Sequence, residues 1–214
     1  MKLFYQYCSF GFCNCYILGA DENEWQAMKS DKELTPPAII IDPCNMEKNT
    51  LEIIENNNFD IKAILVTHDH LSHVRGLRTL KRIYDVDVYA VNQNIMEHKT
   101  IMVKDSDKIK IENFDIEVIS IPGHSSDSVV FKIDNLLFTG DVLTAGLVGS
   151  TASAYGATTQ MNNLRSRLLS LPGDYIVLPG HGPPSTLEAE RRFNTDIFNY
   201  DLNRAKRPVY RLDL

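Results

Sequence analysis

The sequence has no long apolar run, no surplus of basic residues and only a few cysteines, and these shortages narrow the class of protein. No apolar run reaches the roughly 18 residues of a membrane-spanning helix, and the amino terminus is studded with polar residues and shows no signal-peptide core. We therefore expect a cytoplasmic protein with no membrane partner. The net charge of −6 lacks the basic surplus that binding to a phosphate backbone needs, so no nucleic-acid partner is expected.

The four cysteines are Cys8, Cys13, Cys15 and Cys44. They could form two disulfides, but a reducing cytosol favours free thiols. The Cys13-x-Cys15 spacing lacks the two-residue gap of a usual zinc or redox pair. In an extended strand these two side chains share one face, so we interpret them mainly as core or sheet residues.

What is present fits one compact domain. The chain has 214 residues with 43% hydrophobic content, enough for one sizeable core, and no linker-like or repetitive stretch divides it. We predict a single domain over residues 1–214, with a polar tail at 200–214. The polar stretch 20–37 is longer than a hairpin connection of about 2–5 residues, so we interpret it as an insertion loop. Surface decoration is the favoured interpretation, and a flap over the site carrying Trp25 is the alternative.

Apolar periodicity predicts a mixed order of strands and helices. The predicted strands cover residues 2–8, 12–18, 38–42, 61–66, 86–91, 109–111, 115–121, 127–133, 136–139 and 175–178. Helices are predicted to begin at residue 49 and to cover residues 74–84 and 161–171, with a hairpin turn at 134–135. Ser185-x-x-Glu188 matches a capping box, which is expected to begin the final helix.

Three of the six histidines lie in the segment 67–73, directly after the apolar strand 61–66. They therefore stand at the carboxyl end of a strand, where α/β proteins build their sites. Neutral imidazole is the commonest protein ligand for zinc and also suits iron. His68 and His70 alternate in a short loop, so both rings can turn toward one ion.

Two further histidines lie in glycine-containing turns. His124 follows Gly123, and His181 lies between Gly180 and Gly182, where close backbone turns are needed. His98 has no such setting and is expected to be solvated. The clustering of histidines at strand ends predicts a metal site.

In their order along the chain, these motifs resemble the metallo-β-lactamase superfamily, specifically its glyoxalase II-like (hydroxyacylglutathione hydrolase-like) enzymes. The family pattern is His-x-His-x-Asp-His after a strand, then Gly-His, Gly-Asp and Gly-His. The matching segments here are 68–73, 123–124, 140–141 and 180–181, within a resemblance that spans residues 3–195. The resemblance implies an α/β (α+β) fold, a four-layer αββα sandwich with the metal site at one edge of the sheets.

The resemblance also implies a binuclear ligand set, with zinc as the expected metal at one or two ions per chain. The implied ligands are His68, His70 and His124 for the first ion, and His73, His181 and the bridging Asp141 for the second. Ser72 stands where the family has an aspartate that binds the second ion. A neutral hydroxyl is a poor zinc ligand beside a carboxylate. Asp69 is not expected to substitute, because its position in the family points away from the metals.

These residues imply a metal-dependent hydrolase acting on a small molecule. Zinc strongly lowers the pKa of bound water, toward about 7, so a metal-bound hydroxide, held by His68, His70 and His124 and bridged toward Asp141, can attack a carbonyl carbon. A thiolate leaves with little acid assistance, which favours a thioester or a related small ester or lactone as substrate. Tyr155 is a weaker candidate, because it either donates a hydrogen bond to substrate or packs against the sheet.

Two departures from the family pattern place glutathione specificity in doubt. The family's glutathione thioesterases carry a carboxyl-terminal helical domain, whereas only residues 182–214 follow His181 here. The segment 149–152 reads Gly-Ser-Thr-Ala where the family often has Gly-Arg-Thr-Asp.

Two alternatives to hydrolysis stay open. Persulfide dioxygenases resemble the same family but use one iron held by two histidines and one aspartate, for which His68, His124 and Asp141 are the matching positions; such a facial set suits Fe(II) and oxygen. The other alternative is a catalytically weakened relative that retains metal. The presence of every family ligand other than the aspartate at Ser72 argues against it.

Overall fold

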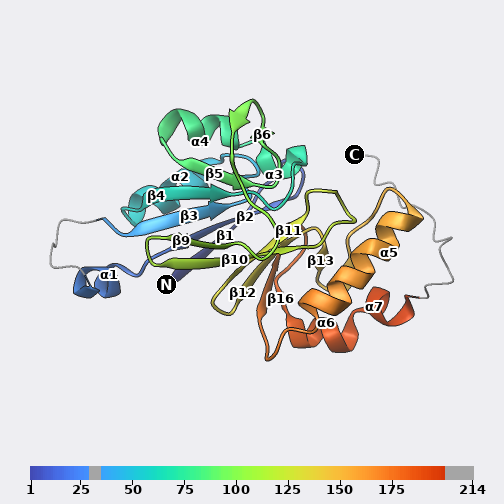
Figure 1. The fold of residues 1–214 in the computed structure, drawn as a ribbon. Coiled ribbons are helices and arrows are strands. Elements are labelled where there is room, and N and C mark those ends of the chain that lie inside the picture. The colour runs from blue at the N-terminus through green and yellow to red at the C-terminus, as the bar shows by residue number, and fades with distance from the viewer. Residues whose placement is uncertain (29–34, 201–214) are drawn as a thin grey trace. The chain divides into compact units, whose positions relative to one another are not determined.

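The computed structural model describes residues 1–28 and 35–200 (Figure 1). The predicted tail after residue 200 and the middle of the predicted insertion, residues 29–34, lie outside the described residues. Contacts divide the chain into two compact units, one of Met1–Val103 with Ile109–Asp115 and the other of Lys104–Lys108 with the chain from Ile116 onward. Within the described ranges, no helix is long and apolar enough to cross a membrane.

The first unit contains a six-stranded sheet in the order β1-β2-β3-β4-β5-β8. Its strands are β1 (Lys2–Tyr7), β2 (Asn14–Gly19), β3 (Pro37–Ile41), β4 (Asp60–Leu65), β5 (Asp87–Ala90) and β8 (Ile101–Met102). The first three strands pair antiparallel and the others pair parallel. Parallel neighbours need crossover connections, which are supplied here by α2 (Lys48–Asn56) and by α3 (Leu71–Val74) with α4 (Leu77–Ile83). A small hairpin, β6 (Asn94–Ile95) and β7 (His98–Lys99), precedes β8.

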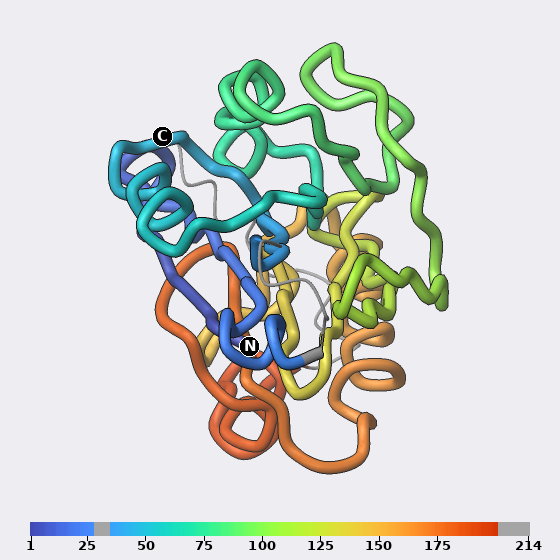
Figure 2. Tube along the Cα trace, turned by 90° about the vertical axis from the view of Figure 1, so that its left-hand side faces the viewer, coloured from blue at the N-terminus to red at the C-terminus, as the bar shows by residue number. Residues whose placement is uncertain are grey.

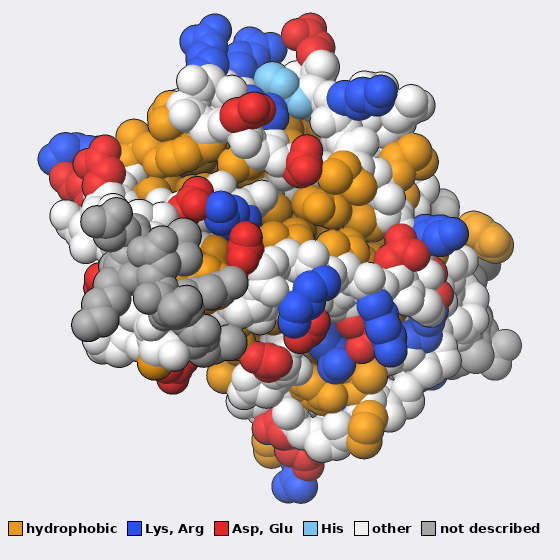
Figure 3. All heavy atoms as spheres, turned by 60° about the vertical axis from the view of Figure 1, so that its left-hand side comes forward, with side chains coloured by type: hydrophobic (Ala, Val, Ile, Leu, Met, Phe, Trp, Pro, Cys, Tyr) orange, Lys and Arg blue, Asp and Glu red, His pale blue; other side chains and the backbone are white. Residues whose placement is uncertain are grey.

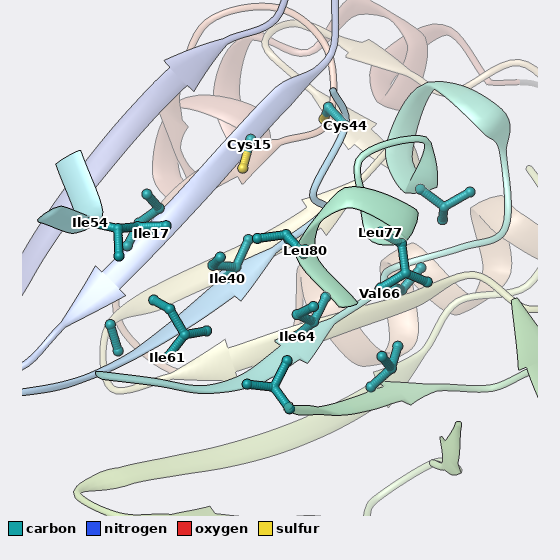
Figure 4. Close-up of a cluster of buried hydrophobic side chains, with 14 of the residues drawn as sticks. Cys15, Ile17, Ile40, Cys44, Ile54, Ile61, Ile64, Val66, Leu77 and Leu80 are labelled. Atoms are coloured by element: carbon teal, nitrogen blue, oxygen red, sulfur yellow. The ribbon is translucent and has the colours of Figure 1, made fainter. Parts of the chain in front are cut away.

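The core of this unit lies between the sheet and its helices (Figure 4). Ile40 and Ile64 are register partners on the parallel strands β3 and β4, and both are fully buried. Ile54 of α2 and Leu80 of α4 are buried in the same cluster. Burial of such a side chain contributes about 1.5–3 kcal/mol relative to exposure. The helices thereby fix where the strand ends lie.

The predicted insertion loop is partly helical. Helix α1 (Glu22–Met28) begins after Asp21, whose side chain accepts hydrogen bonds from the amides of Asn23 (3.0 Å) and Glu24 (3.3 Å). This is an N-cap, a signal in the polar sequence that the loop interpretation overlooked. Trp25 is 5% exposed and so belongs to the packed interior.

The second sheet runs in the order β16-β15-β12-β11-β10-β9. Its strands are β9 (Lys108–Ile111), β10 (Phe114–Ser120), β11 (Val129–Ile133), β12 (Leu136–Gly140), β15 (Ile176–Pro179) and β16 (Ser185–Thr186). β11 and β12 form the predicted antiparallel hairpin around residues 134–135, and β12 pairs parallel with β15. The crossover between them contains the short pair β13 (Leu143–Thr144) and β14 (Leu147–Val148) and then helix α5 (Ala154–Asn163). Leu164 and Leu168 of the crossover are buried in the core of this unit.

Two helix boundaries differ from the sequence prediction. Helix α5 begins at Ala154 rather than 161, with Ser153 as its N-cap, and continues into a π-helical turn, η1 (Leu164–Leu168), as one coil in the trace of Figure 2. The capping residue of α6 (Leu187–Phe193) is Thr186, whose side chain accepts from the Ala189 amide at 3.2 Å. Ser185 is instead paired with Val177 in the sheet. A further helix, α7 (Thr195–Asn199), follows.

Acidic and basic side chains are interspersed with apolar ones over the face drawn in Figure 3. Ion pairs close in sequence include Lys48 with Glu52 (2.7 Å) and Arg192 with Glu188 (2.6 Å). Exposed pairs of this kind contribute little to stability.

Candidate metal centre

The histidine loop of the first unit follows β4, as the sequence predicts. His70 is the N-cap residue of α3, and its carbonyl accepts a hydrogen bond from the His73 amide at 2.8 Å. The Nε2 of His68 and the Nδ1 of His70 lie 3.0 Å apart. Nitrogens that bind one tetrahedral zinc at about 2.0–2.1 Å stand about 3.3 Å apart, so these two atoms have the spacing of a ligand pair.

Asp42 organises this loop from the end of the neighbouring strand β3. Its buried carboxylate accepts hydrogen bonds from the Thr67 amide (2.8 Å) and hydroxyl (2.7 Å), and its Oδ2 lies 2.8 Å from the Nδ1 of His73. A carboxylate only accepts, so His73 carries its proton on Nδ1 and keeps Nε2 as the ligand atom. The sequence analysis missed Asp42. The signal was its place at a strand's carboxyl end, beside Thr67 and its histidines.

The tautomer of His68 follows from the same network. The Thr67 hydroxyl donates its only proton to Asp42, so it accepts from the Nδ1 of His68, which lies 3.1 Å away. The Nε2 of His68 then carries the lone pair that faces His70.

Ser72 lies under a tight turn of the first unit. Gly11 has φ +70°, and a Cβ on it would stand 2.7 Å from the Cβ of Ser72. The positive φ and this close approach both require glycine. Asp69 is exposed, and its Oδ2 lies 3.4 Å from the side-chain amide of Asn92.

The cysteine prediction is corrected for two residues. Cys13 and Cys44 form a disulfide, because the chain after β3 and the chain before β2 meet in the packed first unit with a Cα–Cα distance of 6.0 Å. Cys8 and Cys15 are free and buried, as expected. Cys44 follows Asp42 by two residues, so the disulfide joins the loop that carries Asp42 to the start of β2.

The second unit brings three predicted ligands together. Asp141 and His181 follow the parallel neighbours β12 and β15, so their strand ends meet, and the His181 Nδ1 lies 2.7 Å from the Asp141 Oδ1. His124 donates from Nδ1 to the Ser150 carbonyl (2.8 Å), which places its lone pair on Nε2, 3.6 Å from the Asp141 Oδ2. Gly123, at φ +147°, leaves no room for a Cβ beside Gln160.

Tyr155 lies in the first turn of α5 and is 82% exposed. Its phenol therefore does not pack against the sheet, which removes one of the two predicted roles. A role toward substrate stays a prediction.

Each unit thus offers metal donors in a suitable protonation state. The first unit supplies three imidazoles, and the second supplies two imidazoles and a carboxylate. Histidine and carboxylate donors of this kind fit zinc and also fit iron. The chemistry of the donors therefore fits the metal that the sequence implies.

Comparison with known proteins gives a family match that spans parts of both units. The family model described as the Metallo-beta-lactamase superfamily matches residues 37–181. The hydroxyacylglutathione hydrolase GloC of Haemophilus influenzae is 28% identical over 205 residues, which cover 85% of this chain and 91% of the relative. The hydroxyacylglutathione hydrolase of Francisella philomiragia is 34% identical over 147 residues, 67% of this chain and 58% of the relative. The crystal structure of ETHE1 from Myxococcus xanthus is similar in fold, with a TM-score of 0.80 and 22% identity over 96% of this chain and 88% of that one.

Proposed function

This chain belongs to the metallo-beta-lactamase superfamily and has its mixed α/β fold, and on that premise we propose that it is a metal-dependent hydrolase of the glyoxalase II-like type. The proposed substrate is a small thioester or a related ester or lactone. The observation that carries the proposal is the pair of ring nitrogens of His68 and His70 at 3.0 Å, at the motif that the family uses for its first metal.

We propose that the predicted ligands have the roles that the family resemblance implies. His68, His70 and His124 would hold the first ion. His73 and His181 would hold the second, with Asp141 between them. Ions bound there would supply a hydroxide nucleophile at neutral pH and polarise a substrate carbonyl.

The chain's own residues prepare this chemistry. Asp42 and Thr67 fix two imidazoles of the first unit with their Nε2 atoms available for ligation, and the Ser150 carbonyl does the same for His124. Asp141 accepts from His181 through one oxygen, and its other oxygen lies toward His124. In this proposal the carboxylate also orients the attacking water.

The missing carboxylate ligand at Ser72 indicates which leaving group the substrate should have. A second site with one carboxylate fewer binds its ion more weakly, so substrates whose leaving group needs no proton are harmed least. A thiolate is such a group, whereas an amine is not. The names of the relatives, hydroxyacylglutathione hydrolases, agree with a thioester.

The test is hydrolysis of a panel containing a glutathione thioester, a thioester without glutathione and a lactone. We expect turnover of at least one thioester, loss of turnover with a chelator and recovery with zinc. Asp141→Asn should lower kcat/KM at least about 100-fold. Asp115→Asn, an exposed carboxylate paired with Lys110, is the matched control and should retain activity. Zinc-loaded protein with no turnover of any panel member would contradict the proposal.

A mononuclear iron oxygenase is the second candidate, and Ser72 is the observation that favours it. One iron per chain, with oxygen uptake on glutathione persulfide and no thioester hydrolysis, would replace the hydrolase proposal. Elemental analysis of protein purified without added metal separates the two.

A further inference from the structure

Cys13 lies beside a predicted metal ligand within the first unit. It is fully buried at the start of the segment leading into β2, and its Sγ lies within 4.8 Å of a ring nitrogen of His73. His73 is fully buried too, and its Nδ1 is engaged by Asp42. A sulfur and an imidazole at this separation can bind one ion with small side-chain movements, since Zn–S and Zn–N distances are about 2.3 and 2.0–2.1 Å.

The turn that precedes Cys13 contacts Ser72, the position where the family has a metal-binding aspartate. Gly11 lies against Ser72, and Cys13 follows it by two residues. Ser72 offers a neutral hydroxyl, whereas a cysteine thiolate offers a negative charge and a soft donor, both of which zinc favours. The turn that contacts Ser72 therefore also carries a sulfur that becomes an anionic donor once the disulfide is reduced and the thiol is deprotonated.

We propose that Cys13, when reduced, is a thiolate ligand of the second metal ion together with His73, in place of the carboxylate absent at Ser72. The Cys13–Cys44 disulfide withholds this ligand. The inference rests on the proposed function, because the second ion is part of that proposal.

A small-molecule thiol can reduce the Cys13–Cys44 disulfide to the two free thiols. Two such thiols give two electrons and two protons to the Cys13–Cys44 bond and leave as one small disulfide. Cys13 then loses its proton to solvent when the ion binds. Cys44 takes up the other proton, and its Sγ lies 3.2 Å from the Asp42 carbonyl oxygen, which can accept a hydrogen bond from the thiol.

The test uses the full chain, reduced with a phosphine and loaded with Co(II) as a spectroscopic probe. We expect two ions per chain and a thiolate-to-cobalt charge-transfer band in the near ultraviolet. Cys13→Ser should lose the band and one of the two ions while keeping the other, and the retained ion shows that the variant is folded. Cys15→Ser removes a buried free thiol two residues away and should keep both ions and the band.

A rescue variant separates ligation from structural support. Cys13→Ser combined with Ser72→Asp should recover the second ion without recovering the band. Wild-type protein oxidised with glutathione disulfide should bind one ion and show no band. A band that persists in Cys13→Ser, or two ions in both that variant and the oxidised wild type, would overturn the inference.

The outcomes also separate this inference from the proposed function. Thioester turnover by reduced wild-type protein that shows no thiolate band would contradict the inference that Cys13 is a ligand, but it would support the hydrolase proposal. A thiolate band that depends on Cys13, without turnover of any panel substrate, would support Cys13 as a ligand and contradict the hydrolase proposal.

Discussion

Asp42 has the widest influence of any single side chain at the candidate centre. It binds no ion in the proposed scheme, yet its two oxygens fix Thr67 directly, His73 directly and His68 through the Thr67 hydroxyl. Its backbone has φ +50°, a conformation that costs energy for a residue other than glycine. The hydrogen bonds that this conformation permits offset that cost.

Asp42→Asn should weaken binding of the ion held by His73 about 10–100-fold, as removal of a supporting carboxylate typically does. The physical reason is that an amide can present a donor to the Nδ1 of His73 and so disfavour the tautomer that binds metal. Competition with a chromophoric chelator measures the affinity. Asp69→Asn, the same change at an exposed position of the same loop, should leave the affinity unchanged. Equal affinities in the two variants would show that Asp42 does not act through His73.

At the scale of elements, the junction of α3 and α4 is fixed by a close backbone approach. Gly76 donates from its amide to the Cys44 carbonyl at 2.8 Å, and a Cβ on Gly76 would stand 1.9 Å from the Pro43 carbonyl oxygen. Its φ of −69° suits any residue, so only the contact requires glycine. The contact ties α3, which carries His73, to the segment that carries Asp42.

Gly76→Ala should therefore lower the free energy of unfolding by about 1–3 kcal/mol, the usual cost of overpacking. Urea unfolding at neutral pH measures this loss. Arg78→Ala, at an exposed position of α4, should change stability by no more than about 0.5 kcal/mol. Equal unfolding midpoints for the two variants would mean that the Pro43 segment moves away at little cost.

A second contact between elements is made by the carboxylate of Asp105, which links the loop before β9 to β10 and η1. It accepts hydrogen bonds from the Ser120 amide (2.9 Å) and from the Arg167 guanidinium. Partial burial raises the pKa of Asp105, but the hydrogen bonds from Arg167 and Ser120 outweigh it, so the pKa lies below its ordinary value of 3.8.

A carboxyl group whose pKa is lowered by folding stabilises the fold above its unfolded value and loses that contribution as the pH falls through its folded value. Asp105→Asn should thus be less stable than wild type at pH 7, and the difference should shrink once the pH falls below 3.8. Unfolding measured across this range tests the sign. Asp134→Asn, an exposed carboxylate in the β11–β12 turn, is the control, and a pH-independent difference for Asp105→Asn would contradict the linkage.

At the scale of the whole molecule, the proposed centre draws ligands from segments spread over most of the chain. An ion that binds only the folded state stabilises it by about 2.7 kcal/mol at a free concentration of 100 times Kd. For a chain of this size we expect a chelator to lower Tm by about 5–10 °C relative to that condition. His68→Ala should lose most of this dependence on metal, whereas His98→Ala, outside the predicted ligand set, should keep it. Calorimetry with and without zinc measures both.

Much of the fold was predictable because its signals are local. Alternating or continuous apolar runs located the longer strands to within two residues at each end, since period-two burial is evident in adjacent positions. Helix α5 was predicted to begin too late, because its first turns, from Ala154, are polar and carry no apolar period. Helix α1 was missed for the same reason, and only the cap at Asp21 marks it.

The sequence by itself determined the family, the chemistry of the donors and their places at strand ends, since each motif is a short pattern whose meaning does not depend on distant residues. Only the tertiary structure decided which side chains support those donors. Asp42 meets Thr67 and His73 across 25 and 31 residues, and Cys13 meets Cys44 across 31. Such meetings depend on strand register and helix packing, which no local pattern encodes. The sequence shows that Ser72 replaces a metal-binding carboxylate, but only the fold shows that the Cys13 sulfur lies near His73.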